Sequence, residues 1–291
     1  MQPFAVATLA ALTWLASIGL TQTPSTSEGG GPVLRSGGSY VTRFEQTFSS
    51  VIWHERYDQV SRQHLEFASS GSTFSTVTAR RSLESELFLA WIPADASWIA
   101  VRDVISVNGA PRPPHDRRLQ GVLNGTTVSS GQLRQLATGN GRFNIGQIVR
   151  TFNEPTLALL FLDEHYRHRF AFTPRAEQTI DGSRAVVHEF TERSRPTVIQ
   201  ERSRDVPASG TIWIEANGGR VLRTSLILSS ADGRLGGRMT VQYGPHPKFD
   251  VLVPLEMREV YTSSSGEEIT ATATYSDFRR FETGTRLVHK Q

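Results

Sequence analysis

The C-terminal third of the chain carries the pattern that most constrains the fold, short runs of alternating apolar and polar residues separated by glycine turns. Asp181-Gly182, Asn217-Gly218-Gly219 and Asp232-Gly233 are typical of tight hairpins because these residues tolerate a positive φ. Alternation places the apolar side chains on one face of each strand. Consecutive strands joined by short turns form an antiparallel meander, and a long twisted meander curves toward a barrel or half-barrel.

The apolar face of this meander is a candidate ligand-binding surface. Its strands carry Ile212 and Ile214, then Leu222, Leu226 and Leu228, then Met239, Val241 and Tyr243, then Leu255, Met257 and Tyr261, and finally Ile269, Ala271, Ala273 and Tyr275. Methionine adapts to ligands of different shape, although it fills ordinary core gaps in the same way. We therefore hypothesise that part of this face lines a ligand cavity, formed by Leu226, Met239, Val241, Leu255 and Met257.

Two segments are expected to form helices that the sheet wraps. An apolar stripe at three- and four-residue steps, from Tyr40 to Ile52, predicts a helix that opens near Ser36 to Ser39, followed by a first strand from Trp53 to Val60. The segment from Pro155 to Leu162 is apolar all round, which is typical of a buried core helix or of a plug or lid in a hydrophobic cavity. The predicted fold class is α+β and β-rich, with a long curved antiparallel sheet, a half-barrel, wrapping one or two helices.

The middle of the chain changes from strands to a long connection. Alternation from Leu83 onward predicts two strands, and Asn108-Gly109 is typical of the tight turn that follows them. The segment from Ala110 to Gly141 is rich in Pro, Gly and Arg, so we expect a connection with one short helix from about Ser130 to Ala137.

The N-terminus has the outline of a secretory signal. Residues Phe4 to Leu20 form an apolar run, and a small, polar stretch follows from Thr21 to Gly31. A retained membrane anchor is the alternative, but the run is at the short end of what a bilayer requires. The expected organisation is a signal peptide at 1–20, a flexible linker at 21–36, a single β-rich domain at 37–283 and a tail at 284–291. The protein is expected to be exported, to a periplasmic or extracellular location.

The charge balance and the absence of cysteine exclude several classes of protein. The chain has 31 basic and 28 acidic residues, and the resulting net charge of +3 is too small for a dedicated nucleic-acid surface. Without cysteine there is neither a disulfide framework nor a lipid-modified N-terminal cysteine, so stability must come from packing.

Catalytic and metal-binding motifs are weak. No Gly-x-Ser-x-Gly nucleophile elbow occurs. His165 and His168 have a spacing that could bring two imidazoles to a metal, but a third ligand is missing from the pattern and a polar helix end is the favoured interpretation. We therefore predict no metal, no cofactor and no enzymatic activity.

Paired acidic residues are also interpreted as surface. Glu84 and Glu86 alternate on a strand at a separation that would suit a glycosidase pair, yet two glutamates on the wet face of a strand are common. His54-Glu55 and His188-Glu189 are likewise interpreted as strand surface rather than as proton relays.

The C-terminal strands also carry a resemblance. The segments are Gly210 to Arg223 (GTIWIEANGGRVLR), Met239 to Tyr243 (MTVQY), Leu252 to Met257 (LVPLEM) and Thr274 to Phe278 (TYSDF). Over roughly residues 185 to 281 the chain resembles uncharacterised secreted bacterial proteins and, more distantly, the outer-membrane lipoprotein-sorting carriers of the LolA and LolB type. The resemblance implies a curved antiparallel sheet that wraps helices and holds acyl chains on its concave face.

The expected function is therefore binding. We expect a secreted, non-catalytic protein of the cell envelope that holds a lipid, an acylated protein or another apolar ligand, with membrane association peripheral at most. The alternative is a structural or assembly protein that acts through protein contacts, and a hydrolase with unrecognised residues comes third.

Removal of the leader can be checked directly. N-terminal sequencing of the mature protein should give a first residue between about 20 and 32, within the usual length of a leader. Intact Met1 in a soluble cytoplasmic fraction would contradict this expectation.

Overall fold

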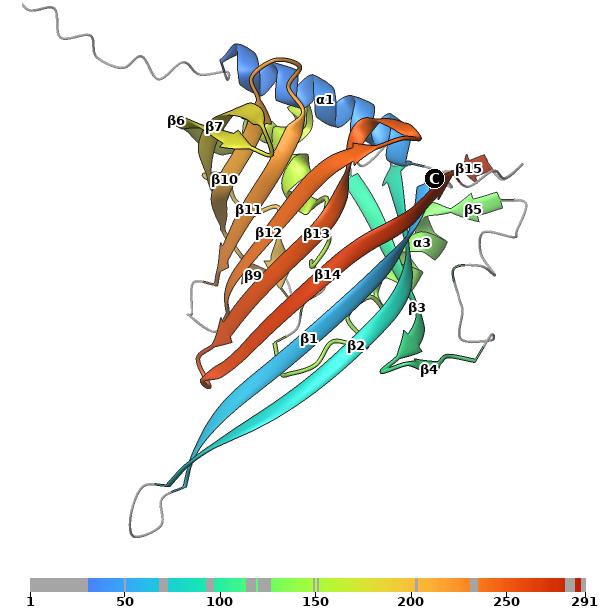
Figure 1. Cartoon of the computed structure of the whole chain (residues 1–291), viewed down its shortest axis with the longest axis vertical. Helices are drawn as coiled ribbons and strands as arrows, with labels where there is room; N and C mark the ends of the chain where they lie inside the picture. The colour runs from blue at the N-terminus through green and yellow to red at the C-terminus, as the bar shows by residue number, and fades with distance from the viewer. Residues whose placement is uncertain are drawn as a thin grey trace, which may run out of the picture.

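The computed structural model describes residues 31–49, 51–67, 73–92, 97–113, 119, 127–148, 150, 152–201, 204–230, 235–280 and 286–288. Its main feature is one large antiparallel sheet (Figure 1). The strands of this sheet in the described residues are β1 (Val51–Phe67), β2 (Thr73–Ile92), β3 (Ser97–Val107), β4 (Ala110–Pro111), β6 (Phe170–Ile180), β7 (Ser183–Glu192), β10 (Ala208–Glu215), β11 (Val221–Ser229), β12 (Leu235–His246), β13 (Phe249–Ser263) and β14 (Glu267–Arg280).

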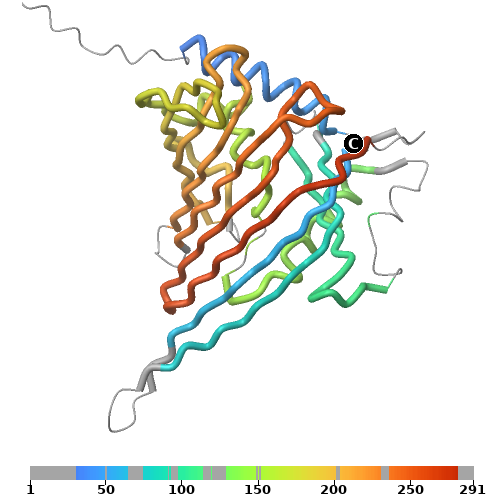
Figure 2. Tube along the Cα trace, viewed as in Figure 1, coloured from blue at the N-terminus to red at the C-terminus, as the bar shows by residue number. Residues whose placement is uncertain are grey.

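The strand order explains how both ends of the chain build one surface. The order is β4-β3-β2-β1-β14-β13-β12-β11-β10-β7-β6, so β1 pairs with β14 and joins the N-terminal hairpin to the C-terminal meander. The sheet is open, with β4 and β6 at its edges, and it curves around the remaining segments (Figure 2). The prediction of a β-rich α+β half-barrel is confirmed. Two-stranded pairs form separately, from β5 (Thr127–Ser129) with β15 (Arg286–Val288) and from β8 (Gln200–Glu201) with β9 (Arg204–Asp205).

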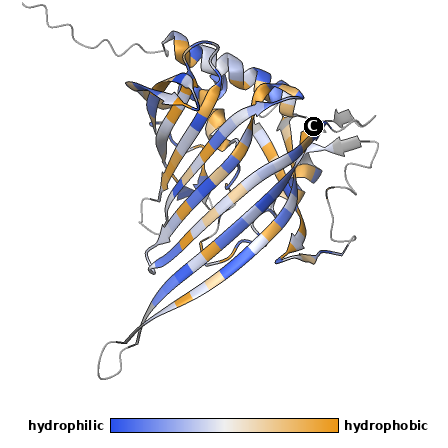
Figure 3. Cartoon of the chain, in the orientation of Figure 1, coloured by the Kyte–Doolittle hydropathy of each residue, from blue (hydrophilic) through white to orange (hydrophobic). Residues whose placement is uncertain are grey.

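The alternation in the sequence accounts for the curved sheet. Along β10, buried and partly exposed residues alternate without interruption, and hydrophobic and hydrophilic residues alternate along the neighbouring strands (Figure 3). Asp181 and Gly182, at the turn from β6 to β7, have φ of 47° and 80°, as the hairpin signal predicts. Strand β1 is longer than predicted, and beyond Gln63 its register continues with β2 but not with β14.

Helix α1 (Pro32–Phe48) lies across one end of the sheet (Figure 1). It begins earlier than predicted, because Pro32 suits the first turn, where a missing N–H costs nothing. Residues 32–36, predicted as the end of a linker, therefore belong to the helix. The hydroxyl of Tyr40 accepts a hydrogen bond from the backbone N–H of Leu252 at 3.1 Å, which attaches α1 to β13.

The segment between β4 and β6 contains three short helices in the described residues. These are α3 (Ser130–Ala137), the 3₁₀-helix η3 (Leu157–Leu162) and α4 (Glu164–Arg167). Helix α3 has the predicted bounds, and a capping box between Ser129 and Gln132 starts it. Helix η3 is buried as predicted, but it is a 3₁₀-helix and is shorter than the predicted helix.

Two hydrophobic cores lie on opposite faces of β2. The large core fills the concave side and includes Leu83, Leu87 and Leu89 of β2. A smaller core lies under α3 on the other face, formed by Ile52, Phe88, Ala90, Ile92, Ile99, Val101, Leu119, Leu133 and Leu136. Because successive residues of a strand point to opposite sides, β2 contributes to both.

Several predicted segments lie outside the described residues, namely the signal peptide at 1–20, the linker as far as residue 30, the Asp232-Gly233 turn and most of the tail. None of the helices in the described residues is both long enough and apolar enough to cross a lipid bilayer.

The buried Glu45 of α1 predicts a pH-dependent stability. Its side chain is 4% exposed, and burial, followed by the charges of Asp163 and Glu164, raises its pKa from 4.5 to about 8. The folded protein then keeps a proton that the unfolded chain releases, so this stabilisation is complete below the ordinary pKa and is lost as pH rises toward the folded value. As the pH rises from about 5 to about 8, the Glu45→Gln variant should therefore lose less thermal stability than the wild type.

Thermal unfolding followed by circular dichroism checks this expectation. Glu177→Gln on β6 is the matched control, because the Glu177 side chain is 51% exposed. The assignment to Glu45 is wrong if Glu45→Gln and Glu177→Gln show the same dependence on pH as the wild type.

Candidate functional site

The concave face of the sheet carries two neighbouring rows of buried residues, each of which crosses the strands from β1 to β10. One residue per strand contributes to each row through the pairing register. The Gln59 row consists of Gln59, Ala271, Glu259, Met239, Leu226 and Gly210. The Tyr57 row consists of Tyr57, Ala273, Met257, Val241, Thr224 and Ile212. Both rows are polar at β1 and mainly apolar from β12 to β10.

Four of the five residues predicted to line a ligand cavity lie in these rows. Leu226 and Met239 belong to the Gln59 row, and Val241 and Met257 belong to the Tyr57 row; each is at most 2% exposed. Leu255 lies elsewhere, because its side chain is 41% exposed. The pairing of β12 with β13 shifts register between Gln242 and Tyr243, and this irregularity breaks the alternation on which the prediction relied.

Protein atoms cover the rows completely. The side chains are nearly inaccessible because α1 and η3 pack onto the concave side as part of the same hydrophobic core. Two contacts hold this cover in place. The hydroxyl of Tyr243 donates a hydrogen bond of 2.5 Å to the carbonyl of Pro155, just before η3. Gly38 lets α1 approach the end of η3, since a Cβ there would lie 3.0 Å from the carbonyl oxygen of Leu162.

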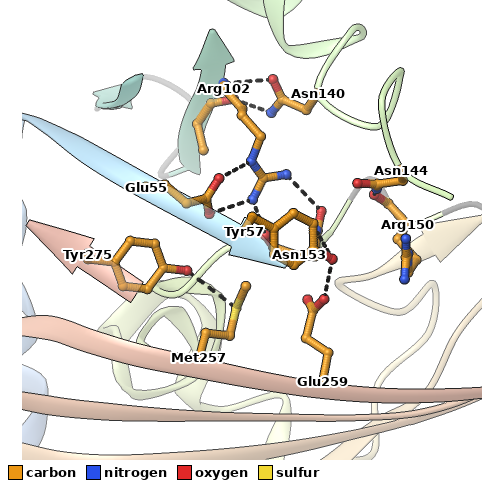
Figure 4. A network of polar contacts seen from close by, with 11 residues as sticks. Glu55, Tyr57, Arg102, Asn140, Asn144, Arg150, Asn153, Met257, Glu259 and Tyr275 are labelled. Carbon is orange, nitrogen blue, oxygen red and sulfur yellow. Dashed lines mark hydrogen bonds and ion pairs between the residues drawn. The ribbon is translucent and has the colours of Figure 1, made fainter. Parts of the chain in front are cut away.

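A buried ion pair stands at the polar end of the rows (Figure 4). Arg102 of β3 donates from Nε to Glu55 Oε2 at 2.6 Å and from Nη2 to Glu55 Oε1 at 3.0 Å, and both side chains are at most 3% exposed. Burial alone lowers the pKa of Arg102, but the charge and hydrogen bonds of Glu55 outweigh burial and raise the pKa overall. Arg102 therefore stays charged and links β3 to β1 across the intervening strand β2.

The same arginine fixes the irregular segment between α3 and η3, which covers the polar end. Its Nη1 donates to Asn153 Oδ1 at 3.2 Å, and its Nη2 donates to the Asn153 carbonyl at 3.0 Å. Asn140 bonds the backbone of β3 on both sides, accepting from the Arg102 N–H at 2.9 Å and donating to the Ala100 carbonyl at 2.7 Å. Arg102 thus connects two strands to the segment that covers them.

The carboxyl group of Glu259 and two tyrosines, Tyr57 and Tyr261, form the next part of the network, of which Figure 4 labels Glu259 and Tyr57. Glu259 accepts hydrogen bonds from the hydroxyls of Tyr57, at 2.5 Å, and Tyr261, at 3.1 Å. Asn153 donates to the Tyr57 hydroxyl at 3.1 Å. Burial raises the pKa of Glu259, and the hydrogen bond from Tyr57 opposes this shift. The net direction is upward because desolvation disfavours the ionised form of the carboxyl group.

Arg150 extends from the covering segment toward Gln59 of β1. Its Nη2 donates to Gln59 Oε1 at 2.6 Å and to the Ile145 carbonyl at 3.1 Å, and the guanidinium lies 5.4 Å from the centre of the Tyr261 ring. The Ile145 N–H also donates to Gln59 Oε1, at 3.2 Å. Gln59 is therefore the point on β1 where the covering segment attaches.

The sequence interpretation missed this network because its β1 residues look like a solvent face. Glu55, Tyr57, Gln59 and Ser61 share one side of β1 at the period of a strand, and all four are buried. The interpretation of Glu55 as strand surface was wrong. His188 is also buried, at 8% exposure, whereas its neighbour Glu189 is exposed and pairs with Arg175. Polar residues facing inward at period two were the signal, but only their tertiary partners distinguish them from a wet face.

The other residues considered for chemistry lie apart from the rows. Glu84 pairs with His54 and Arg56, and Glu86 pairs with Arg279. His165 lies in α4, where its Nδ1 is 2.8 Å from Asp163 Oδ1 and its side chain is 56% exposed. This position fits the predicted polar helix end. The described residues include no cluster of three or more His, Cys, Asp or Glu side chains that could hold a metal ion.

Comparisons with known proteins give distant structural similarities. The chain is similar to a DUF1329 family protein from Desulfovibrio piger, with 13% identity and a TM-score of 0.37, covering 85% of this chain and 92% of that one. It is also similar to a domain from Vibrio parahaemolyticus described as an outer membrane lipoprotein-sorting protein, with 12% identity and a TM-score of 0.32, covering 87% and 95%. Such a domain is among its structural neighbours, in agreement with the resemblance seen in the sequence.

A third similarity is to lipovitellin, in a structure of lipid–protein interactions, with 8% identity and a TM-score of 0.28, and this chain spans 26% of that protein. No protein-family model and no curated protein matches the chain. With TM-scores this low, none of these similarities transfers a function.

The buried ion pair gives a test of how the covering segment is held. Glu55→Gln should destabilise the protein by about 3 to 5 kcal/mol, because it leaves the Arg102 charge buried without compensation. Combining Glu55→Gln with Arg102→Met should cost less than the sum of the single changes, since the double variant buries no unpaired charge. Urea unfolding of the four proteins measures these free energies, and strictly additive costs would show that the two side chains are not coupled.

Proposed function

We propose that this protein binds an apolar ligand, such as a lipid or the acyl chain of an acylated protein, along the Gln59 and Tyr57 rows. The observation that carries the proposal is the nature of the cover. A single open sheet presents an apolar concave face, and the described residues that fill it belong to helices and irregular segments rather than to a second sheet. Such a cover can move away without breaking the pairing of the sheet.

Helix η3 is the part of the cover that an acyl chain would replace. Residues Ala158 to Leu162 are at most 6% exposed, so η3 is buried around most of its circumference. A 3₁₀-helix has poorer hydrogen-bond geometry than an α-helix, and runs longer than three or four residues are uncommon. In the proposed cycle, η3 occupies the apolar part of the rows when no ligand is bound and leaves it when an acyl chain enters.

The lining suits ligands of varied shape. Met239 and Met257 lie side by side with Leu226 and Val241 in the two rows, and unbranched thioether side chains repack at low cost. The proposed setting is the cell envelope, after export to the periplasm or the cell surface, with contact to membranes that is peripheral at most. The proposed role is that of a carrier without catalytic activity.

A structural or assembly role in the envelope is the second candidate. The observation that favours it is the near-zero exposure of the row residues, which is also what a permanently filled core shows. The two candidates differ in one respect: a carrier exchanges η3 for a ligand, whereas a scaffold keeps η3 in place.

Weakening η3 distinguishes the candidates. Leu159→Ala removes a fully buried side chain from η3 and should destabilise the ligand-free protein by about 2 to 5 kcal/mol. If η3 competes with the ligand, the same change lowers the cost of opening and should tighten the uptake of a neutral fluorescent apolar probe. Bound probe should then restore part of the lost melting temperature.

Leu133→Ala is the matched control. Leu133 is equally buried but belongs to the small core under α3, on the other side of β2, so its loss should destabilise the protein without changing probe uptake. Lipid extraction of protein purified from its own envelope provides an independent check. The scaffold takes first place if no lipid co-purifies and no variant takes up the probe.

A further inference from the structure

The polar end of the Gln59 row contains buried hydrogen-bond donors without acceptors. Among the described residues, Nε and Nη1 of Arg150 and Nε2 of Gln59 are buried and have no hydrogen-bond partner. Both side chains are only 1% exposed. The guanidinium therefore has three free N–H groups and the Gln59 amide has two. These five N–H groups, on two side chains that are hydrogen-bonded to each other, have no acceptor among the described residues.

This arrangement differs from that of the neighbouring arginine. Arg102 has a bidentate carboxylate partner in Glu55, whereas the side-chain partner of Arg150 is the neutral amide oxygen of Gln59, and its Nε and Nη1 have no hydrogen-bond partner among the described residues. A buried guanidinium with two unsatisfied nitrogens is costly, because its charge is desolvated and the donors on Nε and Nη1 have no acceptor. The ligand that best relieves both costs is an anion with two or more oxygens, since carboxylate and phosphate match the fork of the guanidinium.

The surroundings of Arg150 admit an added negative charge. The nearest acidic group in the row is Glu259, whose two oxygens already accept from Tyr57 and Tyr261. Burial raises the pKa of Glu259, whereas the hydrogen bond from Tyr57 and the charge of Arg150 act in the opposite direction. Arg150 and Gln59 thus supply the unpaired buried donors to which an anion at this end of the row would bind.

The course of the Gln59 row across the strands indicates where the apolar tail of such a ligand would lie. From Gln59 the row passes Ala271, Glu259 and Met239 to Leu226, four strand spacings or about 19 Å at the usual distance between strands. A head group held at Gln59 would therefore place its tail on the apolar part of the rows. Building on the proposed function, we infer that Arg150 and Gln59 bind the anionic head group, carboxylate or phosphate, of an amphiphile whose acyl chain lies along the Gln59 row.

Ligands that share one chain but differ in head group test this inference. Hexadecanoate, hexadecyl phosphate and hexadecanol are compared for displacement of the neutral fluorescent probe from the full-length exported protein. The two anions should bind at least about tenfold more tightly than the alcohol, because hydrogen bonds to a charged group contribute more than those to a neutral one. The relative affinity of the two anions shows which head group the site prefers.

Gln59→Glu tests the residues. The change is nearly isosteric and places a carboxylate beside the free N–H groups of Arg150, where it takes the position of the ligand's anion. The ratio of anion to alcohol affinity should fall by about tenfold, and the melting temperature should not decrease, because the new carboxylate satisfies the guanidinium. Arg258→Gln is the control, since Arg258 is 71% exposed on β13 and should leave the ratio unchanged.

Several results would overturn the inference. Equal affinity of the wild type for hexadecanoate, hexadecyl phosphate and hexadecanol would show that the head group is not recognised, and this comparison needs no variant. An unchanged ratio in folded Gln59→Glu would place the anion elsewhere. Displacement of the probe by acetate or inorganic phosphate at the same concentration as the long-chain anions would show a simple anion site. If the probe itself does not bind, the proposed function fails and this inference falls with it.

Discussion

The ion pair between Arg102 and Glu55 is the interaction on which the covered concave face depends. Two charges buried in a protein core are tolerated only when they are paired and hydrogen-bonded, and here the pairing is bidentate, at 2.6 and 3.0 Å. The same guanidinium donates to Asn153, and the backbone N–H of Arg102 donates to Asn140. A single residue therefore connects β1, β3 and the segment between α3 and η3. The position of this segment in turn places Arg150 against Gln59.

The openness of the sheet sets the second constraint. An open, strongly curved sheet has an apolar concave face that must be covered, and in this protein α1 and the irregular segment through η3 provide the cover. The polar end of the cover is attached by a dense hydrogen-bond network, whereas its apolar end is held mainly by packing. This asymmetry favours movement at η3 over movement at Arg102, and it is why the proposed ligand chain lies at the apolar end.

The two buried arginines differ in their partners, and this difference separates an arginine that stabilises the fold from one that is available to bind a ligand. Arg102 is satisfied within the fold, and the energetic cost of burying it is offset by Glu55. Arg150 is buried to a similar degree but has free donors on two of its nitrogens. A protein in which both arginines served only to stabilise the fold would be expected to pair both, so the unpaired one is the candidate for recognising something outside the chain.

The sequence by itself determined the meander, the turns at Asp181-Gly182 and Asn217-Gly218-Gly219, helix α3 and the inward direction of Leu226, Met239, Val241 and Met257, because period-two alternation and glycine turns are local properties. Only the tertiary structure decided that Glu55, Tyr57 and Gln59 point inward. A buried strand with polar residues has the same sequence pattern as a solvent-exposed strand, and only the partners of these residues, on β3 and in the segment between α3 and η3, distinguish the two. The irregular pairing that turns Leu255 outward was equally invisible, because a bulge depends on the register of two strands and not on either one alone.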